Sequence, residues 1–338
     1  YELVDSNGIV PIRISEKEYV RAHDFRRYLH KNLEDFLIET PLENPLELLN
    51  KEFDDSLIQK ILAQWPSFNF KKSNIDKFLE NLNIDKTVEI SSIKGGYSNA
   101  IKQLNKFIDV GYKDYAKFSS DPSKEASSQL SPYFHFGQIS THEVFEKLSK
   151  IENWSLESID PKMVGRREGW WGSSENFESF MDELITWREL GYHTCVRRAN
   201  YNQYSSLPEW AIKTLQEHSS DEREHIYSLD ELTYSQTHDE IWNAAQNQLR
   251  TQGIIQNYLR MLWGKKILEW TPNPQLALSY MITLNDRYSL DGRDPNSYSG
   301  VFWILGRYDR AWGPERNIYG KIRYMTSDST ARKFNLKP

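Results

Sequence analysis

Two tryptophans in one apolar stretch are the first residues whose spacing could serve chemistry. Trp263 and Trp270 stand seven residues apart in NYLRMLWGKKILEW, which on an α-helix is two turns, or about 10 Å of rise, along one face. Apolar residues repeat at this spacing in any buried helix, so packing is the commoner reason for it. Asn257 and Arg260 in the same stretch favour a second interpretation, because buried polar groups need partners and a large polar cofactor would supply them.

An acid and a large ring form a second candidate pair. Glu183 and Trp187 are four residues apart in MDELITWRE, so a helix would place them on one face. The ring could stack on a nucleobase while the carboxyl group takes part in a hydrogen bond. A solvent-facing acid beside a core tryptophan is the commoner arrangement, and the sequence leaves both interpretations open.

Three hydroxyls precede a predicted helix in SSQLSPY, at Ser127, Ser128 and Ser131. Hydroxyls and free amides at the start of a helix form a cradle for a phosphate group. Simple capping of the helix would use the same residues. The spacing is therefore compatible with a phosphate site but does not require one.

Other familiar sites are missing from the sequence. It has no phosphate-binding loop, no glycine-rich dinucleotide motif and no G-x-S-x-G motif. The single cysteine, Cys195, excludes an internal disulfide and a cysteine-built zinc site or iron–sulfur cluster within this chain. His135, His193, His218 and His238 lack metal-ligand spacing with the carboxylates, so we expect no metal site.

Helices must position these residues. Amphipathic runs predict helices at about 23–39, 55–64, 74–83, 97–110, 140–150, 177–195 and 208–217. Thr237 and Glu240 predict a capping box at the start of one more helix, and Gly253 suits a left-handed stop after it. The stretch with the two tryptophans should then form a second helix that ends before Pro272 and Pro274.

The predicted fold class is mainly α, because few stretches alternate as strands do. GIVPIRI (8–14) is an exception, since it has the pattern of a strand or of a linker that leaves something upstream. The turn-rich LNDRYSLDGRDPNSYSG (284–300) is typical of a site-forming loop.

The composition is that of a globular intracellular protein. The 338 residues are 38% hydrophobic and 27% charged, but 11 tryptophans are unusually many. No apolar run approaches the length of a membrane span, and the N-terminus has no signal-peptide pattern. A net charge of -6 argues mildly against binding nucleic acid, yet basic residues concentrate after residue 260. That concentration predicts either a local positive surface or an ordinary solvated face.

Six strings, in order along the chain, resemble class II cyclobutane pyrimidine dimer photolyases. They are LSPYFHFGQIS (130–140), FMDELITWREL (180–190), THDEIWNAAQNQL (237–249), NYLRMLWGKKILEW (257–270), LNDRYSLDGRDPN (284–296) and GKIRYM (320–325). One such string is a weak signal, but six in the family's order are a strong one. The resemblance covers roughly residues 1–335 and implies the helical FAD-binding domain of the photolyase/cryptochrome family.

The resemblance implies one FAD per chain, held without a covalent bond and active as FADH⁻. In the family pattern, one group of residues lies at the FAD diphosphate, and Asn257 and Arg260 flank the isoalloxazine ring. Two further residues lie at the polar edge of that ring, and one lies near its N5 atom. The residues at the diphosphate are Tyr115, Ser127, Ser128, Leu130 and Ser131. Those at the polar edge are Asp291 and Arg293, and the one near N5 is Asn285.

The implied activity is that of a deoxyribodipyrimidine photolyase, a carbon–carbon lyase of DNA repair. One electron passes from reduced FAD to a flipped-out dimer, the cyclobutane ring splits and the electron returns; photolyases are themselves among the standard examples of base flipping. Glu183 matches the acid that hydrogen-bonds the dimer. The aromatic walls of the lesion pocket match Trp187 and Trp303, and the electron-carrying chain matches Trp263, Trp242 and Trp270. The residues that match DNA contacts near the lesion are Asp309, Arg310 and Trp312.

The resemblance also implies a domain organisation. Residues 1–15 are expected to be a strand or linker from a missing N-terminal α/β domain that would hold any antenna chromophore, and 16–338 the helical FAD- and DNA-binding catalytic domain. The expected partner is UV-damaged DNA, bound by a monomer without a membrane. The expected compartment is the cytoplasm in a prokaryote or the nucleus in a eukaryote.

Two other functions remain open from the sequence. A cryptochrome-type photoreceptor would keep FAD and the tryptophans without repair, although Glu183, Trp187, Asn285 and Trp303 favour repair. A helical DNA-binding module with no cofactor is also compatible with the composition.

Overall fold

The computed structural model describes residues 4–38, 40–42, 44–48 and 55–336. The chain divides into two compact units, one formed by Tyr1–Glu39 with Ile90–Pro338 and one by Thr40–Glu89. The sequence did not predict a separate unit at 40–89. Every candidate site residue belongs to the larger unit.

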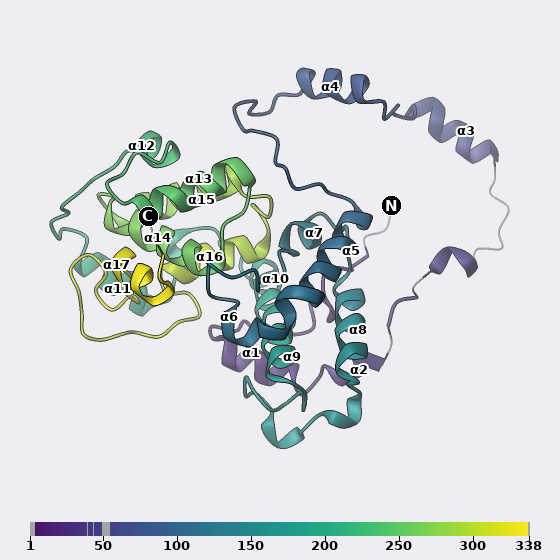
Figure 1. Ribbon diagram of the computed structural model, residues 1–338, viewed down its shortest axis with the longest axis horizontal. Helices are drawn as coiled ribbons and strands as arrows, with labels where there is room; N and C mark the ends of the chain where they lie inside the picture. Colours follow the sequence, from purple (N-terminus) through teal and green to yellow (C-terminus); the bar gives the residue numbers. More distant parts are fainter. Residues whose placement is uncertain (1–3, 39, 43, 49–54, 337–338) are drawn as a thin grey trace. The chain divides into compact units, whose positions relative to one another are not determined.

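The larger unit is built from helices (Figure 1). They are α1 (Ala22–Leu29), α2 (Glu34–Ile38), α5 (Tyr97–Lys106), α6 (Tyr115–Phe118), α7 (Ser131–His135), α8 (Thr141–Glu152), α9 (Glu175–Met181), α10 (Arg188–Arg197), α11 (Glu209–Glu217), α12 (Leu229–Thr233), α13 (Glu240–Gln252), α14 (Asn257–Glu269), α15 (Pro274–Tyr288), α16 (Pro295–Ile304) and α17 (Ser327–Phe334). The described residues form no β-strand, only isolated bridges that join Arg21 to Tyr308 and Arg316 to Gly320. The predicted class, mainly α, is confirmed.

The segment GIVPIRI forms no strand in the structure. Ile9 and Val10 are buried in the core of the larger unit, and the Ile9 backbone N–H donates to Glu189 of α10 over 2.7 Å. A buried carboxyl group thus takes the backbone hydrogen bond that a neighbouring strand would otherwise provide.

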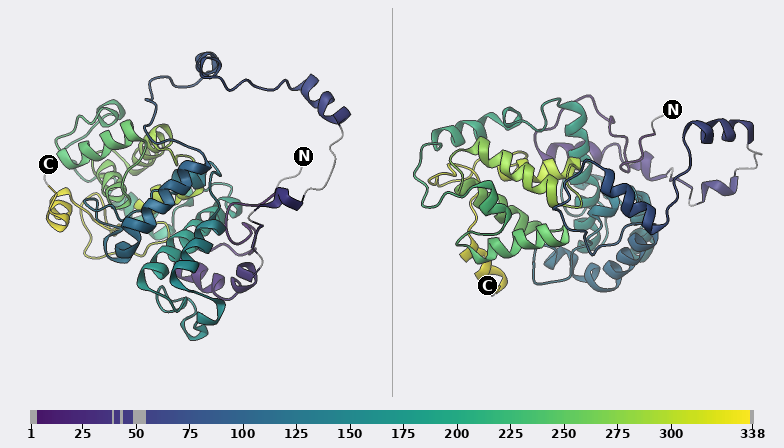
Figure 2. Two further views of the ribbon diagram at one scale, coloured as in Figure 1. Left: turned by 45° about the vertical axis from the view of Figure 1, so that its right-hand side comes forward. Right: turned by 90° about the horizontal axis from the view of Figure 1, so that it is seen from above.

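Helix α14 is the centre of the C-terminal half of the larger unit. It packs against α13, α15 and α16, which lie beside one another in Figure 1 and in both views of Figure 2. Its residues from Met261 to Leu268 are all buried, as expected of a helix enclosed by others. A Cβ atom on Gly264 would lie 2.2 Å from the Ile304 side chain, so glycine is what allows α14 and α16 to approach so closely.

The predicted helix at 177–195 forms, but its winding changes in the middle. Residues Asp182–Trp187 make a π-helical turn between α9 and α10. Such turns are rare and are found mostly at functional sites. The i, i+4 geometry assumed for Glu183 and Trp187 therefore does not apply, because the π turn is wider than an α turn.

Two other local predictions were wrong. The N-cap of α13 is Asp239, whose carboxylate accepts from the Trp242 N–H over 3.0 Å, and not Thr237. The Thr237 hydroxyl instead accepts from the Asp239 N–H and donates to Asn243. The string 284–300 is largely helical, since α15 runs to Tyr288 and α16 starts at Pro295, with caps from Asn273 and Asp294. By contrast, Gly253 ends α13 with φ 76°, as predicted.

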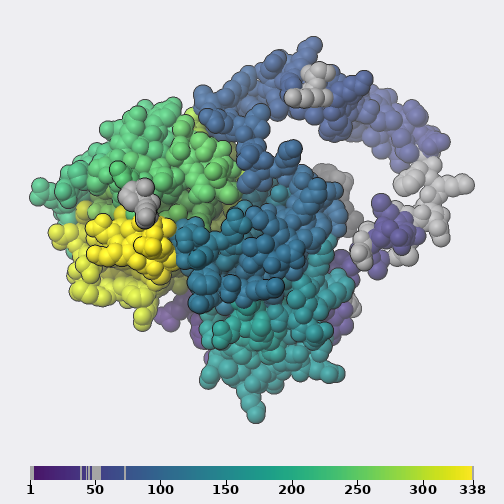
Figure 3. Space-filling model, in the orientation of Figure 1, coloured from purple at the N-terminus to yellow at the C-terminus, as the bar shows by residue number. Residues whose placement is uncertain are grey.

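The C-terminal segment lies against the middle of the chain. In the space-filling view (Figure 3) its residues, in yellow, adjoin green residues from the middle of the chain. The Lys321 N–H donates to Thr214 of α11 over 3.0 Å, and α17 contacts α13. None of the helices in the described part of the chain is both long and apolar enough to span a bilayer.

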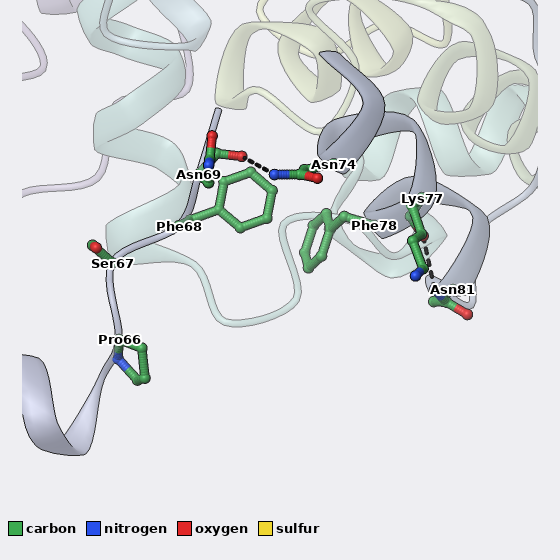
Figure 4. A pocket seen from close by; sticks show the side chains of 8 residues that line it. All are labelled: Pro66, Ser67, Phe68, Asn69, Asn74, Lys77, Phe78 and Asn81. Carbon is green, nitrogen blue, oxygen red and sulfur yellow. Dashed lines mark hydrogen bonds between the residues drawn. The ribbon is translucent and has the colours of Figure 1, made fainter. Parts of the chain in front are cut away.

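The smaller unit carries α3 (Asp55–Gln64), α4 (Lys72–Asn81) and a 3₁₀ turn at Pro45–Leu48. A pocket of about 430 Å³ lies beside α4, and its lining residues are Pro66, Ser67, Phe68, Asn69, Asn74, Lys77, Phe78 and Asn81 (Figure 4). The Phe68 and Phe78 rings meet edge to face, with centroids 5.3 Å apart. All eight lining side chains are solvent-exposed, so the pocket is a hollow on the surface. None of the candidate site residues lines it.

Candidate functional site

Three buried tryptophans lie together in the larger unit. The Trp242 indole N–H donates to the Trp263 carbonyl over 3.0 Å, and the Trp242 and Trp270 ring centroids are 5.5 Å apart. All three side chains are at most 2% exposed. Trp242 therefore contacts both of the other tryptophans, and the structure brings together the three residues that the resemblance implied for an electron-carrying chain.

Trp263 and Trp270 lie on one helix, as predicted, with Trp270 at its very end, where the Trp270 N–H still donates to the Lys266 carbonyl over 3.0 Å. Helix α14 ends at Glu269, and Trp270 is its C-cap with φ -103° and ψ 10°. Trp242 of α13 contacts both of them, through its ring at the Trp270 ring and through its indole N–H at the Trp263 backbone carbonyl. Both α13 and α14 are thus needed to assemble the set.

Sequence reasoning missed the polar partners of these rings. The Trp263 indole N–H donates to Gln246, which is fully buried on α13. Beyond Trp270 lies Tyr227, with ring centroids 5.4 Å apart, and the Tyr227 hydroxyl shares a 2.7 Å hydrogen bond with His238. A glutamine inside an otherwise apolar helix face was the available signal for Gln246.

Glu183 lies in the π-helical turn. Its side chain reaches solvent, although protein atoms surround it on most sides. This desolvation, together with the adjacent Asp182 charge, raises the pKa of Glu183 to about 7, against the lowering effect of Arg167 and Arg26. Near neutral pH the group can therefore carry a proton and donate a hydrogen bond.

A buried ion pair stabilises this turn from the core side. Arg26 of α1 binds both carboxylate oxygens of Asp182, at 2.7 and 2.9 Å, and both side chains are buried. The π turn thus exposes Glu183 while it turns its neighbour Asp182 into the core. A two-point contact of this kind fixes the turn in one orientation.

Tyr115 lies near Glu183. Its ring packs in the core against Phe107 and Phe180, and desolvation followed by the Glu183 charge raises its pKa. The resemblance implied a place at the FAD diphosphate for Tyr115. In the structure, the Tyr115 ring instead packs against Phe107 and Phe180 and lies near the charge of Glu183.

Arg260, Asp291 and Ser131 come from three separate parts of the sequence and lie together. Arg260 Nη2 is 3.4 Å from Asp291 Oδ1, and both side chains are 15% exposed. Burial disfavours ionisation of Asp291, but Arg260 and the hydroxyls of Ser289 and Ser131 outweigh it and lower the pKa of Asp291. The Arg260 Nε–H has no hydrogen-bond partner in the described structure, so the cluster still has a donor to offer to an acceptor group.

The residues predicted at the cofactor differ in exposure. Asn257 is exposed at the first position of α14, and Ser127 and Ser131 are exposed before and at the start of α7, while Leu130 is fully buried. The Ser128 hydroxyl accepts from the Leu130 N–H over 3.4 Å, which is a weak turn contact. The exposed Asn257 and Ser127 can contact a ligand, whereas the Ser131 hydroxyl already contacts Asp291.

The last two cofactor candidates have different surroundings. Arg293 is exposed and has a left-handed backbone with φ 65°, which the hydrogen bond from its N–H to Asp286 supports. Asn285 is buried on α15 and donates to Ser297 of α16. Asn285 therefore has a protein partner already.

The two tryptophans predicted at the lesion come from neighbouring helices. Trp187 ends the π turn before α10, Trp303 lies on α16, and α10 packs against α16. Both rings are half-buried, and the Trp187 ring meets Tyr308 with centroids 6.4 Å apart. Half-buried rings have a face to offer to another flat group.

The candidate DNA-contacting residues form one connected group. The Trp312 indole N–H donates to both oxygens of Asp309 at 3.1 Å, and the Arg310 guanidinium lies 4.7 Å from the Trp312 ring centre. Arg323 lies over both Trp312 and Trp303, at 5.0 and 5.7 Å. Arg323 was not predicted individually, and it connects this group to the aromatic wall.

Comparison with known proteins gives relatives along the whole chain. No family model matches it. A protein named deoxyribodipyrimidine photo-lyase from Methanothermobacter thermautotrophicus is 36% identical over 334 residues, which cover 98% of this chain and 66% of the relative. One of the same name from Arabidopsis thaliana is 37% identical over 342 residues, with 98% and 62% covered.

The fold is also found among solved structures. A bacterial class III photolyase from Agrobacterium tumefaciens matches with a TM-score of 0.57 at 17% identity, covering 98% of this chain and 59% of that protein. At this identity the likeness concerns the fold alone. The chain spans about two thirds or less of the length of each of these proteins.

Proposed function

The chain belongs to the photolyase/cryptochrome family, and on that basis we propose that it repairs cyclobutane pyrimidine dimers in DNA with light, in the manner of class II photolyases. The observation that carries the proposal is Glu183. A solvent-accessible acid that protein atoms surround on most sides, with a pKa near 7, is suited to donate a hydrogen bond to a pyrimidine carbonyl. A photoreceptor that binds no lesion has no use for such a group.

FAD is the proposed cofactor, and when bound it supplies the light-excited electron. Arg260 and Asp291 would hold its polar part, because Arg260 has an unpartnered N–H and Asp291 keeps its negative charge beside it. Ser127, Ser128 and Ser131 would offer hydroxyls to the diphosphate. The set of hydroxyl and guanidinium donors suits a ligand with many acceptor oxygens, such as a diphosphate.

The three tryptophans would carry electrons toward the cofactor. Their rings are buried, so water does not reach them, and Trp242 contacts both Trp263 and Trp270. Gln246 orients the Trp263 ring by accepting its N–H. An alternative role as core packing predicts that phenylalanine would replace each of them without functional loss.

The substrate would be held by stacking and by charge. Trp187 and Trp303 would stack on the flipped dimer, a contact worth about 1–3 kcal/mol per base. Arg310 is exposed beside Trp312 and would enter or border the gap that the dimer leaves. Arg323 would position both rings of this region by its cation–aromatic contacts.

The decisive experiment is repair of a dimer-containing oligonucleotide by the purified chain with FAD, in light and in darkness. Repair in light alone is expected, and Glu183→Ala is expected to remove most of it. Glu168→Ala is the matched control, because Glu168 is an exposed acid with no hydrogen-bond partner in the described structure. Flavin binding without repair in the wild type would instead support a cryptochrome-type photoreceptor.

A further inference from the structure

Lys265 is a charged side chain buried in the middle of α14. It is 1% exposed, and no carboxylate among the described residues lies within ion-pair distance of it. Lysine is almost never fully buried without a partner, because burial of an ammonium group costs several kcal/mol. A position on α14 that an apolar residue could fill therefore has a lysine at a considerable cost in stability.

The Lys265 ammonium contacts the end of α16 at two points. It donates to the carbonyl of Ile304, the last residue of α16, and it lies 5.6 Å from the ring centre of the adjacent Trp303. A cation at a helix C-terminus interacts favourably with the helix dipole, and a cation near an indole face is attracted to it. The two contacts together restrain both the backbone and the ring of the proposed lesion wall.

The charged groups around Lys265 are few. Asp309, which follows α16, favours the ammonium form of Lys265. Arg323, which also lies over the Trp303 ring, disfavours it. Lys266 and Glu269 pair with each other near Trp270, on another side of the helix. Burial dominates these influences and lowers the pKa of Lys265 to about 7. Of the two cations over Trp303, only Lys265 can change its charge in the physiological range.

We propose that Lys265 is a positioning residue for Trp303, whose ammonium group holds the ring for the lesion, and that lesion recognition weakens when this group loses its proton. The part that concerns the lesion rests on the proposed function. The part that concerns the ring rests on the contacts of Lys265 alone. Lys265 does not touch the substrate, so its effect passes through Trp303 and the end of α16.

The first test observes the ring and needs neither DNA nor flavin. The indole N–H resonance of Trp303, assigned with Trp303→Phe, is followed from pH 5.5 to 9 in the whole chain. A titration with a midpoint near 7 is expected in the wild type, and none in Lys265→Met, which keeps the length of the side chain. Lys213→Met, at an exposed site on α11, should leave the titration unchanged. A Trp303 resonance that does not titrate in the wild type overturns the proposal, even if the Lys265 variants fail to fold.

The second test measures the preference for dimer-containing over undamaged duplex, as a ratio of dissociation constants, at pH 6 and pH 8.5. The ratio is expected to fall about tenfold in the wild type as pH rises, the effect of losing one desolvated cation–aromatic contact. Lys265→Met should show the low ratio at both pH values, and Lys265→Arg should keep the high one. An equal, pH-independent ratio in wild type and Lys265→Met overturns the inference. A wild type that never prefers the lesion but still shows the Trp303 titration overturns the proposed function and leaves the Lys265 contact established.

Discussion

The Trp263 indole N–H donates to Gln246 Oε1 over 2.8 Å, and both side chains are at most 1% exposed. Gln246→Leu would leave this N–H unpaired in the core, and an unpaired buried donor costs about 1–3 kcal/mol. We expect the free energy of unfolding, measured in urea, to fall by that amount. Gln248→Leu on the same helix, where the side chain is half-buried, should change it by less than about 0.5 kcal/mol. Equal effects at both positions would show that the hydrogen bond contributes nothing.

Trp263→Phe is expected to block photoreduction of oxidised FAD, whereas repair by chemically reduced protein should persist. Phenylalanine keeps most of the volume, but its ring is much harder to oxidise than indole. The measurement is the rate of flavin bleaching under blue light. Trp171→Phe, at a buried indole in the other aromatic cluster with Phe145 and Phe177, is the control and should bleach at the wild-type rate. Undiminished bleaching in Trp263→Phe would make this tryptophan a packing residue.

Glu183→Ala is expected to lower the quantum yield of repair more than it lowers DNA affinity. A carboxyl group that donates to a pyrimidine carbonyl matters most when negative charge develops there, and loss of one such donor costs about 10²–10³ in rate. Affinity is shared with many phosphate contacts. Both quantities are measured on one dimer-containing duplex, and parallel losses would make Glu183 a binding residue only.

Glu183 should also make the stability of the flavin-free chain depend on pH. Its folded pKa of about 7 is above the ordinary value of 4.5, so between these values the unfolded chain has lost a proton that the folded chain keeps. Its contribution is therefore complete below pH 4.5 and lost as pH rises through 7. Glu183→Gln should gain stability relative to wild type at pH 8 compared with pH 5, by less than about 1 kcal/mol because solvent screens the group. The test is urea unfolding at the two pH values, and a constant difference would contradict the raised pKa.

DNA affinity should fall steeply with salt despite the net charge of -6. Each phosphate neutralised adds about 0.9 to the slope of log K against log salt. Arg310→Ala should weaken binding of dimer-containing duplex more than of undamaged duplex, because its place beside Trp312 is useful only where a base pair has opened. Equal weakening on both duplexes would identify Arg310 as an ordinary phosphate contact, and affinity independent of salt would argue against a DNA-binding surface.

The sequence was a good guide to several helices with a clear amphipathic pattern and to one helix end. Gly253 ends α13 in the left-handed conformation, and α3 and α11 fall close to their predicted ranges. It was a poor guide where several nearby residues could each cap a helix or form a turn. Asp239 displaces Thr237 as the N-cap because its carboxylate reaches the Trp242 N–H directly. The turn-forming residues 284–300 are mostly helical because Asp294 and the proline after it start a new helix.

The candidate site also contains residues that the sequence could indicate and residues that it could not. The family resemblance named Arg260 and Asp291 at different parts of one cofactor, and the structure pairs the two side chains. It also named Asp309, Arg310 and Trp312 as one group, and these three lie together. Neither Lys265 nor Gln246 could be predicted, because their roles depend on contacts with α16 and with the Trp263 ring. Such contacts arise only when helices distant in sequence pack together.

The π-helical turn at Asp182–Trp187 has a consequence for changes in chain length. A π turn contains one residue more than regular winding needs, so deletion of a single residue there would leave the helix continuous from α9 to α10. Because the wider turn takes up the extra residue within itself, the orientation of α10 relative to α9 would stay the same after that deletion. The change would be local to the turn, where Glu183 reaches solvent while its neighbour Asp182 is buried. The number of residues in this segment therefore sets which acid faces outward, and the direction of the aromatic rings on α10 and α16 does not depend on it.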